Sequence, residues 1–305
     1  MSNFSAVLVG INKYQGAPLR GCVNDVTIMR DILVQKYGVP ANQIRLLLDE
    51  RATKEGILER LKWLATCEEQ NKLFYYSGHG AQYPNQPYDK TDWEPDGMDE
   101  ILCPVDFNWQ DKFITDDVID AILDTMPGGH HMSMIFDCCH SGTIDRGVNN
   151  PFEAPAVLKN KKLDMVSKHL PTPLDLMSRM SENVLFEPSV DVTKEFEEFD
   201  LNKGFLDFFA GLKKTTNKRK PNDSKHNVSI ITGCKDDQTS ADAWVGNRYQ
   251  GALSFVIQGL LLKEPTMDLR QLRKQAAKLL AKYGFDQVPQ LSCSTENLEK
   301  KFIQV

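Results

Sequence analysis

The feature that most constrains the fold is the alternation of short apolar runs with longer segments of helical periodicity. Runs rich in β-branched and aromatic residues, which are typical of buried strands, lie at 4–11, 43–48, 72–76, 101–105 and 132–136. Parallel strands need a crossover connection, usually a helix. The alternation therefore predicts an α/β fold with a mostly parallel central sheet that is covered by helices on both faces.

Three helices are expected between these strands. Asn24 is a candidate N-cap for a helix that runs to Tyr37, Thr53 starts a second helix, and a third covers about 116–123. After residue 226 regular patterns return, with a strand at 228–232, helices at 251–262 and 267–283, and a last strand near 287–294.

The stretch between these two regular parts has a different character. It is rich in Pro, Lys, Asp and Glu and lacks strand signals, although 192–214 has the Phe and Leu spacing of amphipathic helices. We predict one domain in three parts: a large catalytic part at 1–147, a partly helical insert or linker at 148–225, and a small C-terminal part at 226–305. The insert is either a helical segment packed on the core or a removable segment that covers a site.

Composition excludes several classes of protein. The chain has 305 residues, 41% of them hydrophobic and 26% charged, which suits a globular fold. No basic leader or membrane-length apolar window occurs, so we expect a cytoplasmic protein without a membrane partner. A net charge of -6 argues against nucleic acid as a partner. The seven cysteines fit neither a disulfide framework nor a zinc site.

Two segments carry candidate chemistry, 75-YYSGHGAQ-82 and 137-DCCHSG-142. Each follows a strand-like run, so if those strands are neighbours in a parallel sheet, His79 and the cysteines emerge at the same edge. A thiol near an imidazole is what a cysteine protease needs. The alternative reading is that Cys138 and Cys139 are small core residues and His79 is a loop histidine with its hydrogen bonds satisfied.

These two segments resemble the metacaspases and their prokaryotic relatives, within the caspase-like clan of cysteine peptidases. Further matching segments occur in the family's order: 19-LRGCVND-25, 97-GMDEILCPVD-106, 115-TDD-117, 233-GCKDDQTSAD-242 and 289-PQLS-292. The resemblance implies a caspase-like (caspase-haemoglobinase) sandwich and protein or peptide substrates. By analogy with the family, it also implies a monomer.

The resemblance also implies roles for individual residues. His79 corresponds to the general base and acid, and Cys139 to the nucleophile, while Cys138 is structural. The backbone amides of Gly80 and Cys139 would form the oxyanion hole. No third carboxylate of a triad is apparent, as expected for the looser dyad of caspase-like enzymes.

The substrate pocket implied by the resemblance is acidic. Asp25 and Asp137 would line it, with Cys22 and Ser77 beside them. Two carboxylates favour a basic side chain, and above all the paired hydrogen bonds of a guanidinium, so cleavage after Arg or Lys is expected. Asp25 also fits an acid at a helix N-terminus, a role compatible with the first.

Calcium is the expected cofactor. The sequence that begins at Asp92 does not match an EF-hand loop, because its twelfth position is Cys103 instead of glutamate. The metacaspase pattern instead points to ligands at Asp99, Asp116, Asp117 and Asp145. The alternative is that Asp116 and Asp117 cap a helix next to a solvated acidic loop.

An enzyme that cuts after basic residues would accept basic sequence in its own insert. We expect calcium-triggered self-cleavage between the catalytic and C-terminal parts, with candidate sites at Lys213, Lys214, Lys218, Arg219 and Lys220. Two other functions stay open: a catalytically idle signalling or scaffold protein on the same fold, and a related peptidase of different specificity.

Overall fold

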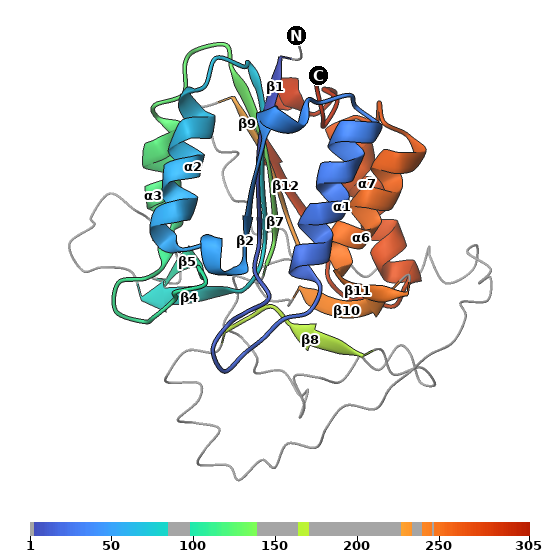
Figure 1. Cartoon of the computed structure of the whole chain (residues 1–305). Helices are drawn as coiled ribbons and strands as arrows, with labels where there is room; N and C mark the ends of the chain where they lie inside the picture. Colours follow the sequence, from blue (N-terminus) through green and yellow to red (C-terminus); the bar gives the residue numbers. More distant parts are fainter. Residues whose placement is uncertain (1–2, 85–97, 139–163, 171–226, 234–239, 246) are drawn as a thin grey trace.

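A six-stranded sheet forms the centre of the molecule (Figure 1), which is described here from a computed structural model over residues 3–84, 98–138, 164–170, 227–233, 240–245 and 247–305. The strand order is β12-β9-β7-β3-β1-β2. The strands are β1 (Phe4–Gly10), β2 (Ile44–Leu48), β3 (Asn71–Ser77), β7 (His131–Asp137), β9 (Val228–Thr232) and β12 (Gln290–Cys293). β12 is antiparallel to β9, and every other neighbouring pair is parallel.

Neighbouring residues of a strand point to opposite sides of the sheet, and here both sets are apolar. In β3, Tyr75 belongs to one buried hydrophobic cluster, and Phe74 and Tyr76 belong to the other. A sheet with two buried faces needs cover on both sides. The near-continuous apolar runs of the sequence follow from this requirement.

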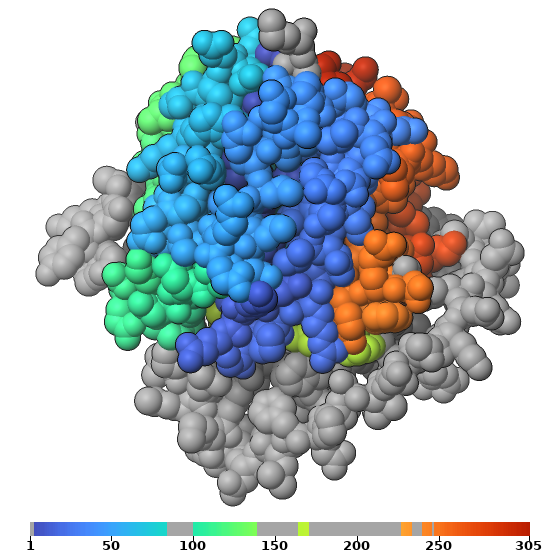
Figure 2. Space-filling view, viewed as in Figure 1, coloured from blue at the N-terminus to red at the C-terminus, as the bar shows by residue number. Residues whose placement is uncertain are grey.

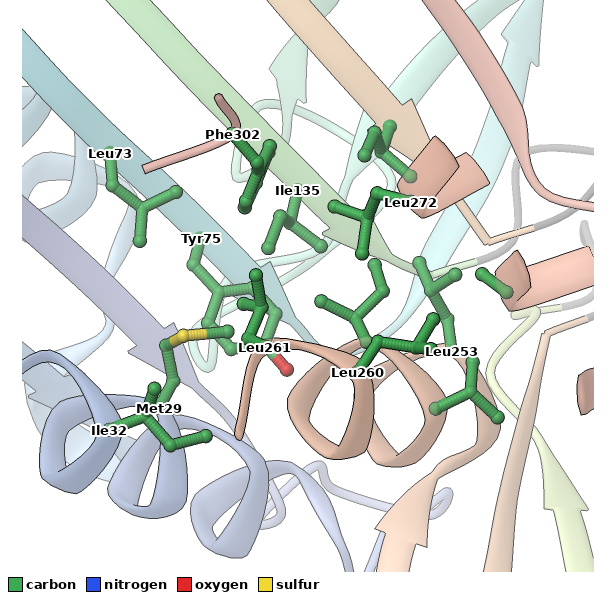
Figure 3. Packing of buried hydrophobic residues seen from close by; sticks show 14 of the residues in the cluster. Met29, Ile32, Leu73, Tyr75, Ile135, Leu253, Leu260, Leu261, Leu272 and Phe302 are labelled. Carbon is green, nitrogen blue, oxygen red and sulfur yellow. The ribbon is translucent and has the colours of Figure 1, made fainter. Parts of the chain in front are cut away.

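Helices supply that cover, as Figure 1 shows. One face carries α1 (Cys22–Gln35), α6 (Ala252–Lys263) and α7 (Leu269–Lys282), and the other carries α2 (Lys54–Thr66) and α3 (Asp116–Leu123). Figure 3 shows the first interface, where Met29 of α1 and Leu261 of α6 pack against Tyr75. The predicted α/β fold, with a mostly parallel sheet covered on both faces, is confirmed.

Two small antiparallel sheets lie at the end of the central sheet that is remote from both termini in Figure 1. One contains β4 (Gly80–Pro84), β5 (Met98–Leu102) and β6 (Ile114–Thr115), and the other contains β8 (Met165–Ser167), β10 (Ala241–Val245) and β11 (Arg248–Gly251). Short 3-10 helices occur at η1 (Ala41–Gln43), η2 (Asp49–Arg51) and η4 (Thr295–Asn297).

Three expectations from the sequence were wrong in detail. The strand expected at 101–105 is β5, which pairs with β4 and β6 and not with the central sheet. The insert does contain a strand, β8, whose three residues owe their conformation to pairing with the distant β10. Helix α1 begins at Cys22, so Asn24 is not its cap; its side chain instead donates to the carbonyl of Tyr249 at 2.9 Å.

Other helix boundaries agree with the sequence. Thr53 caps α2 by accepting from the backbone N–H of Gly56, and α3 covers 116–123 as predicted. None of the helices in the described ranges is both long and apolar enough to cross a membrane. The predicted division at 147 and 225 falls outside the described residues and stays a prediction.

Candidate active site

The candidate site lies where β3 and β7 end. These two strands are parallel neighbours, and Ser77 at the end of β3 pairs with Asp137 at the end of β7. His79 follows the first strand by two residues and Cys138 follows the second by one, so His79 and Cys138 emerge at the same edge of the sheet, as expected. Cys138 is fully buried in the hydrophobic core. Cys139, the predicted nucleophile, lies outside the described residues.

His79 is buried, with 2% of its surface exposed. Its Nε2 lies 2.7 Å from the carbonyl oxygen of Ala17. A carbonyl can only accept, so Nε2 carries the proton and Nδ1 holds the free lone pair. Nδ1 is buried and has no hydrogen-bond partner among the described residues. The imidazole is thus held in place through Nε2, and Nδ1 is left available as a base.

The charge state of His79 follows from its burial. Burial lowers the pKa of His79 to about 4, against the opposing effect of the carbonyl groups of Ala17 and Lys168. The side chain is therefore neutral at physiological pH. A neutral imidazole can take a proton from a thiol, which is what the expected general base must do.

Two buried tyrosines fix the loop that carries His79. The backbone N–H of His79 donates to Tyr14 Oη at 3.0 Å, and Tyr76 Oη donates to the His79 carbonyl at 2.8 Å. The Tyr14 ring also meets the imidazole edge to face, with centroids 4.5 Å apart. A Cβ on Gly78 would come within 2.5 Å of Tyr14 Oη. Glycine is needed at this position because the tyrosines leave no room for a side chain.

Beside His79 the structure brings together the predicted pocket residues Asp25, Ser77 and Asp137, all fully buried. Ser77 Oγ donates to Asp25 Oδ2 at 2.7 Å. The backbone N–H of Gly251 donates to both oxygens of Asp25 at 3.0 Å. Cys22 is also fully buried, and burial raises the pKa of its thiol well above the usual range. The Cys22 side chain is therefore an uncharged part of the pocket lining.

The second carboxylate, Asp137, is held by residues of the C-terminal part. Ser240 Oγ donates to its Oδ1 at 2.6 Å, and the backbone N–H of Ser254 donates to Oδ2 at 3.0 Å. A Cβ on Gly251 would lie only 2.0 Å from Asp137 Oδ2. The pocket thus depends on residues more than 100 positions away along the sequence from Asp137.

A lysine from the insert fills this pocket. The Nζ of Lys168 lies 3.5 Å from Asp25 Oδ2, 3.3 Å from Asp137 Oδ2 and 2.9 Å from Ser77 Oγ, and the side chain is fully buried. Burial alone would lower the pKa of the Lys168 ammonium, but the Asp137 and Asp25 carboxylates outweigh that effect and raise it well above the usual value. The ammonium is therefore charged.

Asp25 is the carboxyl group of the pocket whose charged form is disfavoured by burial. Burial raises the pKa of Asp25 to about 7, with the Lys168 ammonium opposing the rise and the Asp137 carboxylate adding to it. One buried ammonium faces two carboxyl groups here, which explains why Asp25 retains a proton toward neutral pH.

Sequence reasoning missed several residues of the site. Asp242 of β10 is buried, and its Oδ2 accepts from the backbone N–H groups of Arg20 and Gly21 at 2.6 and 3.1 Å. Asp242 ends the matched segment 233–242, and so the motif itself was a signal for it. The sequence contains no signal for Lys168, because it lies in the irregular insert. It contains none for the Ala17 carbonyl either, because Ala17 acts through its backbone.

The predicted calcium ligands are placed only in part. Asp116 and Asp117 form the first turn of α3, whose cap is Thr115 and not either aspartate. Pairing of Ile101 with Thr115 puts Asp99 at the end of β5 that is nearest to this turn. The side chain of Asp99 and the whole of Asp145 lie outside the described residues. Among the groups that the structure does describe, no three His, Cys, Asp or Glu side chains gather as a metal site would require.

The predicted self-cleavage sites at Lys213, Lys214, Lys218, Arg219 and Lys220 also lie outside the described residues, and so they stay predictions.

Comparison with known proteins agrees with this geometry. Residues 5–145 match a family model described as "Metacaspase, peptidase C14 domain". The chain is 32% identical over 311 residues to Metacaspase-1 of Scheffersomyces stipitis, covering 95% of this chain and 70% of that protein. It is 29% identical to Metacaspase-1 of Schizosaccharomyces pombe, covering 95% and 67%.

Two solved structures share the fold. A protein from Geobacter sulfurreducens superposes with a TM-score of 0.59 and 21% identity, covering 98% of this chain and 96% of that one. Caspase-1 from Spodoptera frugiperda superposes with a TM-score of 0.51 and 10% identity, covering 96% and 86%. At these identities the likeness shows the caspase-like fold and no more.

Proposed function

Because this chain belongs to the metacaspase family of cysteine peptidases, we propose that it is an endopeptidase that cuts protein substrates after Arg or Lys. The single observation that carries the specificity is the binding of a lysine ammonium between Asp25 and Asp137. A pocket that already holds a buried basic side chain, with its carboxylates held by Ser77, Ser240 and Gly251, is built for that charge.

The proposed chemistry uses a Cys–His dyad. His79 Nδ1 accepts the thiol proton of Cys139, and the thiolate attacks the carbonyl carbon of the scissile bond. The backbone N–H of Gly80 donates to the oxyanion that develops, and the protonated imidazole then gives its proton to the leaving amine. Water hydrolyses the thioester and regenerates the thiol. The Ala17 carbonyl takes the place of a third triad member, because it fixes the tautomer and the orientation of the ring.

Calcium is proposed as the activator, held by Asp99, Asp116, Asp117 and Asp145. Carboxylate oxygens are the ligands that Ca²⁺ prefers, and the strand register that brings Asp99 toward the start of α3 supports the proposal. In this role the ion would neutralise the negative charge of these four aspartates. Self-cleavage within the insert, a monomeric state and a cytoplasmic location belong to the same proposal.

The test is the release of a fluorophore from short peptides that end in Arg, Lys or Asp, with millimolar calcium or with a chelator. Cys139→Ala is the blank. Calcium-dependent turnover of the Arg and Lys peptides alone supports the proposal. Turnover of the Asp peptide would overturn the pocket assignment, and turnover in chelator would overturn the role of calcium. No turnover under any condition would favour a scaffold on a caspase-like fold.

A further inference from the structure

The segment around Lys168 binds the site with its main chain as well as its side chain. Strand β8 pairs antiparallel with β10, with Ser167 opposite Ala241 and Met165 opposite Ala243. The ladder continues beyond the strand, because the Lys168 N–H donates to the carbonyl of Ser240 at 3.0 Å. Addition of a strand to a sheet edge is a common way in which proteins bind extended peptides.

The carbonyl of Lys168 occupies the place expected for a scissile bond. Its oxygen accepts from the backbone N–H of Gly80 at 3.0 Å, the donor assigned above to the oxyanion hole. Gly80 directly follows His79 in the chain, so this carbonyl lies next to the residue that carries the proposed base. One residue therefore has its side chain in the acidic pocket, its N–H on β10, and its carbonyl beside the proposed base.

Residues on both sides of this carbonyl are held in place. After it, the N–H of Leu170 donates to the Gly80 carbonyl at 3.0 Å. Before it, the Asp164 carbonyl accepts from the Trp244 N–H at 2.8 Å, and the Asp164 side chain pairs with Arg20 at 3.3 Å. Figure 2 shows yellow-green atoms of this segment between the blue N-terminal and orange C-terminal residues. The segment 164–170 thus crosses the site as an extended peptide would.

We propose that the Lys168–His169 peptide bond is the bond that this chain cuts in itself, with 164-DMVSK-168 bound as the substrate. This inference rests on the proposed function and names a different site from the basic residues at 213–220. The Cys139 sulfur forms a thioester with the Lys168 carbonyl carbon while the C–N bond to His169 breaks. The new amine of His169 takes the proton from His79, and water then releases the Lys168 carboxylate.

Occupation of the site has a second consequence. Until the bond is cut and the segment leaves, Lys168 excludes any other basic side chain from the pocket. An external substrate must therefore compete with a peptide that is covalently part of the enzyme, whose effective concentration is in the millimolar range for short connections. The uncut chain is consequently a poor peptidase toward other proteins.

The test maps the fragments formed by the full chain in millimolar calcium, by N-terminal sequencing and intact mass. We expect fragments 1–168 and 169–305 from wild type, and none from Cys139→Ala. Lys168→Gln should lose this cut by at least about 100-fold, because a neutral amide leaves the pocket carboxylates unpaired. Lys168→Arg should retain it, and Lys218→Gln, the matched control in the run 213–220, should cut as wild type does.

A parallel assay of Arg and Lys peptides separates the two proposals. Lys168→Gln should hydrolyse these peptides although it no longer cuts itself at residue 168. Cuts only within 213–220, equally in wild type and Lys168→Gln, would overturn the inference and leave the peptidase function intact. Absence of peptide turnover in every variant would overturn both.

Discussion

Gly251 lies against Asp137 so closely that a Cβ built on the glycine would be 2.0 Å from Asp137 Oδ2 and 2.4 Å from Lys168 Nζ. The space that a basic side chain needs is therefore the space that Gly251 leaves empty. The proposed specificity therefore depends on a missing side chain as much as on the two carboxylates.

Gly251→Ala should abolish activity toward basic residues. The added methyl group fills the pocket, and we expect kcat/KM for an Arg peptide to fall by at least about 100-fold. Gly259→Ala, in the same helix region, is the matched control, because nothing lies within 4 Å of its Cβ. That variant should retain activity and gain about 0.5–1 kcal/mol in free energy of unfolding. Equal activity of the two variants would contradict the pocket.

Tyr14→Phe should weaken the positioning of His79. The substitution removes the acceptor of the His79 N–H and leaves that buried donor unpaired, at a cost of about 1–3 kcal/mol in free energy of unfolding. We expect kcat to fall while KM for an Arg peptide changes little, because the acidic pocket is untouched. Tyr37→Phe, which loses a hydrogen bond to the Pro265 carbonyl far from the site, should leave kcat unchanged. A normal kcat in Tyr14→Phe would show that the tyrosine only supports the fold.

Asp25 should make stability depend on pH in an unusual direction. Its pKa is about 7 in the folded chain and near 3.8 when unfolded, so between these values the folded state binds more protons. The free energy of unfolding should therefore fall as pH rises from about 4 to 7, by at most about 1 kcal/mol per pH unit from this group. Urea unfolding of Cys139→Ala with and without Asp25→Asn isolates the effect, and an unchanged slope in the double variant would contradict it.

His131 should have the opposite effect. Burial lowers the pKa of His131 to about 4, so the unfolded chain binds more protons between about 4 and 6.5. Stability from this group therefore rises with pH across that window and is lost as pH falls through it. Its Nε2 lies 3.0 Å from Ser229 Oγ, a bond that a glutamine can replace in part. His131→Gln should flatten the acid side of the unfolding profile without changing peptide turnover.

The sequence predicted the parts of this molecule whose signals are local. Apolar runs and helical spacing identified the central strands and most helices, because both faces of the sheet are buried. The placement of His79 and Cys138 at the same edge of the sheet was also predicted, because neighbouring parallel strands end on the same side. These features depend on periodicity along a single segment.

What could not be predicted depends on pairing between distant segments. Strand β8 has only three residues and takes its conformation from β10, which lies about 75 positions later in the chain. The burial of Lys168 between two carboxylates follows from that pairing, and nothing near Lys168 in the sequence indicates it. The role of the Ala17 carbonyl was equally hidden, because a backbone group has no residue type to recognise.

The most direct test of the central claim is the ratio of kcat/KM for two peptides, Asp-Met-Val-Ser-Lys and Asp-Met-Val-Ser-Asp, each with a C-terminal fluorophore. The enzyme is Lys168→Gln in millimolar calcium, so that no internal lysine competes. If Asp25 and Asp137 select the basic side chain that the structure shows between them, the lysine peptide should be preferred by at least about 1,000-fold. A ratio near one, or a preference for the aspartate peptide, would contradict the account.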